Sequence, residues 1–174
     1  EALEILSGFP DSPAARNQAG NILARRGRLE EAAAEYDRAV RYGRPLTVAI
    51  ADLDHFKQVN DRWTHATGDA VLKTIANLLV REVRHTDLVA RYGGEEFVLV
   101  LLETGPEAAS TACEKVRAAI EKHDWSGIAP GLAITVSIGW CADTSLAGPD
   151  AMLGAADAAM YRAKAAGRNR VEGG

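Results

Sequence analysis

Two glycines followed by two acids, Gly93-Gly94-Glu95-Glu96, have the types and spacing of a metal or phosphate site at a hairpin tip. The flanking segments, LVARY and FVLVLL, are rich in the residues that favour strands. Gly-Gly between them predicts a tight turn, because the turns that match strand twist need positive φ. Such a turn lets a ligand approach the backbone closely, and acids beside it can hold a metal against a phosphate. A surface hairpin without this role could carry the same residues.

A second acidic pair, Asp52 and Asp54, follows the apolar segment 46–51, which predicts a buried strand. Strand alternation places both carboxylates on one face and Leu53 on the other. With the hairpin acids they form an oxygen-rich set that suits Mg²⁺ and leaves room for waters and phosphates, and two such ions could clamp an in-line displacement at phosphorus. Capping of the next helix is the alternative, and we expect it for Asp54 rather than for Asp52.

Two cations, Lys164 and Arg168, lie four residues apart in the last predicted helix. This spacing places them on one face and suits a polyphosphate. The alternative is a solvated helix end, where cations offset the helix dipole.

Asn60 and Asp69 flank a polar loop. A carboxylate can accept from both the ring N–H and the amino group of guanine, whereas adenine offers no such donor pair, so Asp69 would select guanine. The alternative is that Asp69 caps the helix that it opens.

Hydrophobic spacing predicts which elements carry these residues. We expect helices over 14–42, 55–63, 69–84, 107–123 and 149–166, and strands over 46–51, 88–92, 97–102, 133–140 and briefly at Val171. Strands interleaved with helices around one central hairpin favour an α/β (α+β) domain, with helices flanking a five-stranded, mostly antiparallel sheet. We expect this domain over residues 14–174, after a linker at 1–13.

Composition is that of an ordinary globular domain: 174 residues, 47% hydrophobic, with a formal charge of −4. Mild acidity argues against a nucleic-acid binder, and no apolar segment could span a bilayer or serve as a signal peptide. Cys113 and Cys141 have no metal-like spacing and indicate no disulfide, so a cytoplasmic location is expected. Because the chain begins at Glu1 rather than Met, we expect a fragment of a larger sensor protein.

Six separated motifs together resemble the GGDEF domain of diguanylate cyclases, from about residue 42 to residue 171. The matching segments are DLDHFKQVND (52–61), GDAVL (68–72), ARYGGEEF (90–97), TVSIGW (135–140), ADAAMYRAK (156–164) and GRNR (167–170). The resemblance implies the nucleotidyl-cyclase, ferredoxin-like fold. It also implies an enzyme that condenses two GTP into cyclic di-GMP, a bacterial second messenger, and two pyrophosphates.

The resemblance assigns roles to individual residues. Asp52, the carbonyl of Leu53 and Glu95 resemble the ligands of Mg²⁺ (or Mn²⁺), and Asp52, Glu95 and Glu96 the catalytic acids. The implied phosphate contacts are Phe56, Lys57, Gly93, Gly94, Lys164 and Arg168, and the implied guanine contacts are Asn60 and Asp69. The group that takes the proton from the attacking hydroxyl stays open.

Arg84 and Asp87 resemble the RxxD product-inhibition site of the family, because five residues separate Asp87 from Gly93. Cyclic di-GMP is therefore an expected ligand there. It could also occupy the active site through Asn60 and Asp69.

The resemblance also implies partners. With one nucleotide site per chain, two GTP must face each other, so the catalytic unit is expected to be a homodimer. The isolated domain is expected to be a monomer. An upstream sensory domain is expected to supply dimerisation. One alternative is a non-catalytic GGDEF-type module that binds GTP or cyclic di-GMP, which an altered Glu95 or Lys164 would favour. Another is a cyclase of the adenylyl type, against which Asp69 argues.

Two positions depart from the family pattern. The Leu-Thr-Gly-Leu turn that usually begins the domain is absent from residues 11–17, which affects regulation more than chemistry. Thr64 stands where the family commonly has Gly, and it could stiffen the loop on the guanine side.

Overall fold

A five-stranded sheet in the order β2-β3-β1-β4-β5 organises the protein. The computed structural model describes residues 25–174, with side chains from residue 34 onward. The strands are β1 (Leu46–Leu53), β2 (Leu88–Gly93), β3 (Glu96–Leu102), β4 (Val136–Cys141) and β5 (Val171–Gly173). The pairs β1–β3, β1–β4 and β2–β3 are antiparallel, and β4–β5 is parallel. The expected mostly antiparallel five-stranded sheet is confirmed.

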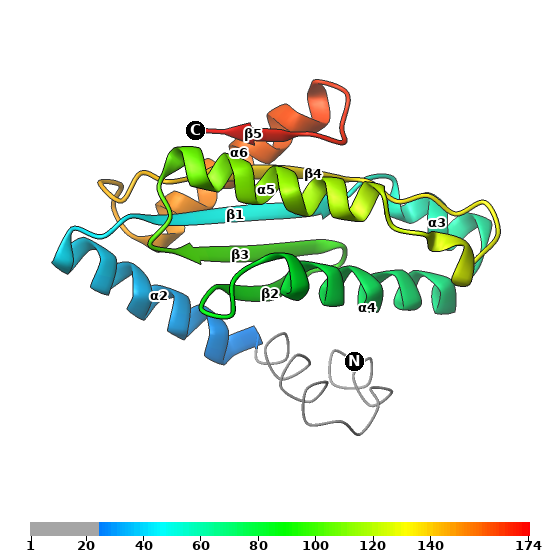
Figure 1. The fold of residues 1–174 in the computed structure, drawn as a ribbon, viewed down its shortest axis with the longest axis horizontal. Coiled ribbons are helices and arrows are strands. Elements are labelled where there is room, and N and C mark those ends of the chain that lie inside the picture. Colours follow the sequence, from blue (N-terminus) through cyan, green and yellow to red (C-terminus); the bar gives the residue numbers. More distant parts are fainter. Residues whose placement is uncertain (1–24) are drawn as a thin grey trace.

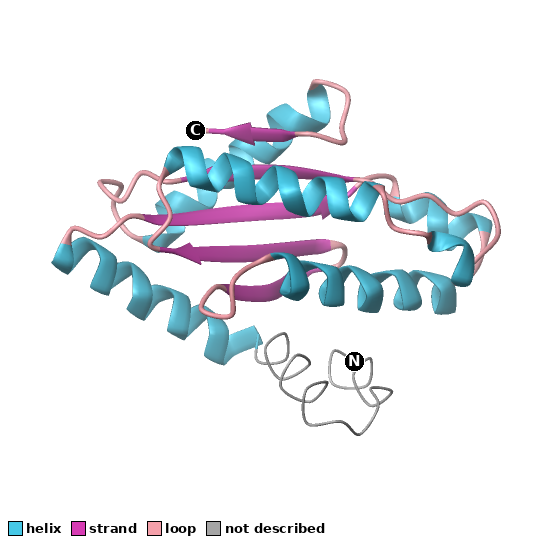
Figure 2. Cartoon of the chain, viewed as in Figure 1, coloured by secondary structure: helices cyan, strands magenta, loops and turns pink. Residues whose placement is uncertain are grey.

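Helices cover both faces of this sheet (Figures 1 and 2). They are α2 (Arg25–Tyr42), α3 (Phe56–Arg62), α4 (His65–Glu82), α5 (Pro106–Glu121) and α6 (Pro149–Ala165), with a short 3-10 turn, η2 (Trp125–Gly127). The order matches the expected one, although the linker at 1–13 and the start of the helix expected over 14–42 lie outside the described residues. Within residues 25–174 no helix combines the length and hydrophobicity needed to cross a bilayer.

The core has two layers because the side chains of β1 alternate between the two faces of the sheet. Ala49, Ala51 and Leu53 pack with residues of α3, α4 and α5. Val48 and Ile50 pack on the other face with residues of α2 and α6. Alternation continues to the end of the strand, so Asp52 lies on the α6 face and opposite to Leu53, as expected.

Helix α4 begins earlier than the hydrophobic pattern indicated. It starts at His65 rather than at Asp69, and Thr64 is its N-cap, with Oγ1 accepting from the backbone N–H of Thr67 at 3.2 Å. A threonine at this position satisfies an amide that the helix itself leaves unpaired. The alternative role of Asp69 as a cap is therefore wrong, because Asp69 lies in the second turn of α4 and no polar loop adjoins it.

Candidate active site

Two acids meet at one end of β1, and a third follows in the adjoining turn. In the sheet register Asp52 stands opposite Glu96 of β3 on one side and Ser137 of β4 on the other. The backbone N–H of Leu53 donates to the carbonyl of Glu95 at 3.3 Å, which ties the hairpin to the strand end. Asp52 is only 6% exposed. Cross-strand neighbours on one face lie close together, so these strands place two carboxylates side by side.

Burial and like charge disfavour ionisation of the carboxylates at the end of β1, and Lys164 offsets part of this effect. Burial raises the pKa of Asp52, and the ion pair with Lys164, 2.8 Å from Nζ to Oδ2, opposes that rise. Burial also raises the pKa of Glu96, and the charge of Asp52 raises it further. Like charges in a desolvated place disfavour ionisation. The site therefore favours an added cation.

Oxygen atoms of the kind that hard divalent cations take lie at and beside this end of β1. No three His, Cys, Asp or Glu side chains within residues 25–174 are arranged as a complete metal cage. Asp52, the main-chain carbonyl of Leu53 and Glu95 are the residues that could hold such a cation together with other ligands. Mg²⁺ is commonly held by one or two carboxylates plus substrate phosphates rather than by protein ligands alone.

The hairpin turn is displaced by one residue from the expected Gly93-Gly94. Gly93 pairs with Glu96 as the last residue of β2, and the two turn residues are Gly94 and Glu95. A register shift between Arg91 and Gly93 causes the displacement. Gly94 has φ +40°, and Glu95 has no positive φ, a combination that fits a type II′ turn. The guanidinium of Arg91 donates twice to the Gly94 carbonyl, at 2.6 and 2.9 Å, and so fixes the exposed tip.

The expected guanine side is built where α3 and α4 meet. A Cβ on Gly68 would collide with Oδ1 of Asn60 and lie 3.2 Å from Cζ of Phe56. Only glycine allows this close approach, which brings Asn60 against the backbone that carries Asp69. Asp69 is exposed and Asn60 half-buried, so both are open to a ligand. Phe56 is buried beneath them, and Lys57 is exposed on the first turn of α3.

Asp54 does not cap a helix, and the expectation that it would is wrong. The residue before α3 is His55, with φ +58° and no side-chain cap hydrogen bond. The buried Asp54 carboxylate instead accepts from Thr135 Oγ1 (2.7 Å), Ser137 Oγ (2.7 Å) and the backbone N–H of Asn169 (3.0 Å). It therefore joins the end of β1 to β4 and to the turn after α6.

Lys164 and Arg168 do not share a helix face, contrary to expectation. Helix α6 ends at Ala165, and Arg168 lies beyond it with φ +64° in a turn where its N–H donates to the Ala163 carbonyl at 3.0 Å. Both cations still act on the same acid. The charges of Lys164 and Arg168 each lower the pKa of Asp52. Tertiary folding thus directs both positive charges toward the acidic site, although helical periodicity does not.

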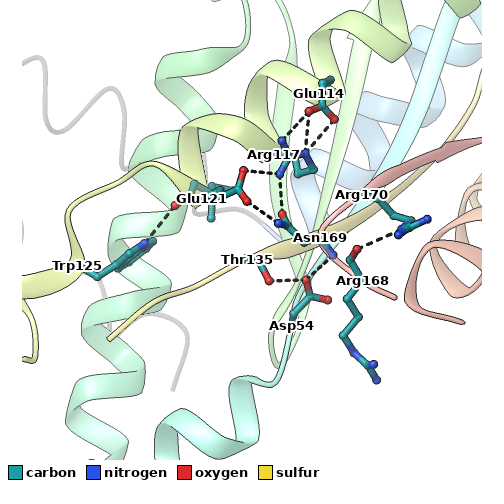
Figure 3. A network of polar contacts seen from close by, with 10 residues as sticks. Asp54, Glu114, Arg117, Glu121, Trp125, Thr135, Arg168, Asn169 and Arg170 are labelled. Carbon is teal, nitrogen blue, oxygen red and sulfur yellow. Dashed lines mark hydrogen bonds and ion pairs between the residues drawn. The ribbon is translucent and has the colours of Figure 1, made fainter. Parts of the chain in front are cut away.

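Sequence reasoning missed the polar network that supports this turn (Figure 3). Arg117 of α5 contacts Asn169, whose backbone is held by Asp54. The GRNR motif contains this asparagine, but the motif alone indicates no role for it. The left-handed conformation that Asn tolerates after a helix end was the available signal.

Arg84 and Asp87 lie at the other end of the hairpin. Asp87 accepts from the backbone N–H groups of Arg84 (2.9 Å) and Leu102 (3.1 Å). Leu102 and Glu96 are the two ends of β3, so about 20 Å of strand separates this turn from the acids. Arg84 borders a cavity of about 290 Å³, which is also lined by Arg38 and Arg44.

Three comparisons show which known proteins this chain resembles. The family model described as "Diguanylate cyclase, GGDEF domain" matches residues 14–170. The Diguanylate cyclase DgcP of Pseudomonas aeruginosa is 43% identical over 152 residues, which are 87% of this chain and 22% of that protein. The chain thus spans about a fifth of that relative's length.

Solved structures show the same likeness. The GGDEF domain of DgcB from Caulobacter crescentus, in complex with c-di-GMP, superposes with a TM-score of 0.80 at 31% identity, over 87% of this chain and 91% of that one. The diguanylate cyclase SiaD of Pseudomonas aeruginosa, in complex with its activator SiaC, superposes with a TM-score of 0.82 at 33% identity, over 99% of this chain and 64% of that one.

Proposed function

The chain belongs to the GGDEF family of diguanylate cyclase domains, and we propose on that premise that it condenses two GTP into cyclic di-GMP and two pyrophosphates. The observation that carries the proposal is the meeting of Asp52 and Glu96 across two strands, with Glu95 in the adjoining turn and Lys164 at 2.8 Å from Asp52. Acids and cations gathered beside a hairpin tip suit a nucleoside triphosphate and its metal.

The proposed reaction is two displacements at phosphorus. The 3′-hydroxyl of one GTP attacks the α-phosphorus of the other, so that an O–P bond forms, the bond between the α-phosphate and the leaving pyrophosphate breaks, and the hydroxyl proton passes to a base. In the second displacement the 3′-hydroxyl of the other nucleotide attacks the remaining α-phosphorus, releases the second pyrophosphate and closes the ring. Stabilising the charge that develops on phosphorus is the main task of such a site.

The protein's own groups would divide this task. Asp52, the Leu53 carbonyl and Glu95 would hold Mg²⁺ or Mn²⁺, which supplies positive charge at the reacting phosphate. Lys164 and Arg168 would bind the polyphosphate, with Lys57 and the backbone at Phe56 beside it. The exposed turn after Gly93 gives the triphosphate room, because Gly94 carries no side chain.

Asn60 and Asp69 are the proposed guanine readers. Asp69 is exposed on α4, and Gly68 lets Asn60 approach the same turn. A carboxylate and a carboxamide can pair with the hydrogen-bonding edge of guanine, and the unpaired carboxylate would reject adenine.

Two GTP need two opposed sites, so we propose that a homodimer is the catalytic unit and that the isolated domain, residues 14–174 after a linker at 1–13, is a weakly active monomer. A dimerising segment joined to this domain would bring two sites together. Cyclic di-GMP would return as an inhibitor at Arg84, with the active site as the alternative place.

The test is incubation of the purified chain with GTP and Mg²⁺, followed by chromatographic detection of cyclic di-GMP. The rate per chain should rise with protein concentration, and a parallel coiled coil fused before residue 1 should raise it at low concentration. GTP binding without any product, even in the fused dimer, would instead identify a non-catalytic binding module.

A further inference from the structure

We infer that Arg117 is a positioning residue, which holds Arg168 at the phosphate side of the site through Asn169 and Asp54. The inference deepens the proposed function and rests on it, because it concerns how the same site holds a nucleotide. Arg117 lies on α5, outside every motif that carries the family resemblance, and its side chain points into the network of Figure 3.

Arg117 is more enclosed and more fully bonded than a surface arginine. Its side chain is 13% exposed. Nε and Nη2 donate to Glu114, while Nη1 donates to Glu121 at 2.8 Å and to Oδ1 of Asn169 at 2.6 Å. The two glutamates raise its pKa above the usual range, so it stays charged. A planar guanidinium with several fixed donors orients its partners more strictly than an ammonium can.

Asn169 passes this constraint to the strand that carries the acids. Its side-chain amide donates to Oε1 of Glu121 at 2.6 Å, so Arg117 and Glu121 together hold the carboxamide. Its backbone N–H donates to Asp54, which Thr135 and Ser137 also hold. Asp54 lies two residues after Asp52. The turn after α6 is thereby anchored to helix α5 on one side and to the end of β1 on the other.

The anchored turn has a backbone conformation that needs support. Arg168 and Asn169 are consecutive residues with φ of +64° and +46°. Non-glycine residues in this region persist when surrounding contacts over-determine them, and they gather at functional sites. Asn tolerates the conformation more readily than Arg does. Arg168 has two backbone contacts of its own, from its N–H to the Ala163 carbonyl at 3.0 Å and from Nε of Arg170 to its carbonyl at 3.2 Å. The contacts of Asn169 add to these and help to hold Arg168 in place.

The consequence concerns the direction of Arg168. Its guanidinium extends away from the network in Figure 3, so the anchored turn sets the direction of that charge. Loss of Arg117 would remove the donor to Oδ1 of Asn169 and leave Glu121 and Asp54 as its partners. With one of its anchors gone, the turn would hold Arg168 less strictly. The nucleotide would then lose a phosphate contact, although no group that touches it has been changed.

A double-mutant cycle of Arg117 and Arg168 tests this relation. The measured quantity is the affinity for a non-hydrolysable GTP analogue, determined by calorimetry with Mg²⁺. Arg117→Ala and Arg168→Ala should each weaken binding about tenfold, the range that supporting residues around a site commonly show. Arg117→Ala placed in the Arg168→Ala background should add less than about twofold. Arg117→Lys should recover only part of the loss.

Two further variants keep the test decisive. Lys122→Ala removes an exposed cation beside Glu121 at the end of the same helix and should leave affinity unchanged. Asn169→Gly keeps the left-handed turn accessible while it removes the side-chain bridge, so it takes the place of Arg117→Ala in the cycle if thermal unfolding shows that Arg117→Ala does not fold.

Unchanged affinity in folded Arg117→Ala, or a tenfold loss that persists without Arg168, would overturn the inference. Because the readout is binding, its failure differs from failure of the proposed function. A chain that binds the analogue tightly but never forms cyclic di-GMP would refute only the proposed synthesis. If synthesis is normal but the Arg117→Ala and Arg168→Ala effects on binding free energy simply add, only the positioning role of Arg117 would be refuted.

Discussion

The ammonium of Lys164 lies 2.8 Å from Oδ2 of Asp52, joining α6 to the strand that carries the acidic site. The two side chains are 29% and 8% exposed, so water screens the pair less than it would a surface ion pair. Lys164 therefore offsets part of the pKa rise that burial imposes on Asp52. A change at either residue alters the charge balance of both.

Replacing Asp52 by Asn or Glu95 by Gln should abolish cyclic di-GMP synthesis. The loss should be at least about a hundredfold, since changing a group that merely supports a metal ligand already costs about 10–100-fold. Both oxygens are proposed to face one metal, and neither substitution changes side-chain volume. Product formation from GTP and Mg²⁺ is the measurement, with circular dichroism to verify folding. Glu107→Gln, an exposed acid in the first turn of α5, is the control. Near wild-type turnover in either variant would refute the metal assignment.

Asp69→Ala should weaken GTP binding by about tenfold or more and leave ATP binding equally poor, because the carboxylate is proposed to accept from guanine. Calorimetry with both nucleotides measures this. Asp61→Ala removes an exposed acid from α3 and should change neither affinity. Since Asp69 does not cap α4, an unchanged GTP affinity would leave it as a solvent-exposed acid with no role in selection.

Gly68→Ala should weaken GTP binding, because the added Cβ collides with the Asn60 carboxamide and displaces it. Overpacking of this kind should also cost about 1–3 kcal/mol of unfolding free energy. Gly154→Ala is the matched control, since that helical glycine has open space around it and should gain about 0.5–1 kcal/mol. Equal GTP affinity for Gly68→Ala and wild type would show that Asn60 does not contact the base.

Glu96→Gln should raise the melting temperature at pH 7. Burial and the charge of Asp52 raise the pKa of Glu96 in the folded protein above its ordinary 4.5, so ionisation costs folding free energy. That cost is present above the folded pKa and disappears as the pH falls below 4.5, where Glu96 is protonated in both states. The difference in melting temperature between variant and wild type should therefore shrink from pH 7 to pH 4. A difference that is independent of pH would contradict this origin.

Arg84→Ala should relieve product inhibition with little change in stability, because the arginine side chain is exposed. Asp87→Ala should relieve it too, but at a cost of about 1–3 kcal/mol, since two backbone amides would lose their acceptor. Inhibition curves with added cyclic di-GMP and urea unfolding measure the two effects. Undiminished inhibition in Arg84→Ala would place the inhibitory product in the active site instead.

The sequence by itself determined the order of the elements, the mostly antiparallel sheet and the family. The continuous apolar segment 46–51 and the helical spacing in 69–84 are local patterns, and they predict a buried strand and an amphipathic helix without knowledge of the rest of the chain. The motifs also predict that Asp52, Glu95, Asn60 and Asp69 belong to one nucleotide site.

Only the tertiary structure decided which polar atoms meet. Asp54 was expected to cap a helix, yet it accepts from the N–H of Asn169, 115 residues away. Arg168 was placed on a helix face, yet it lies in a left-handed turn anchored from α5. Periodicity reports which face of an element is buried, whereas a buried polar group must find its partner wherever packing brings one, and that choice is made by segments far away in the chain.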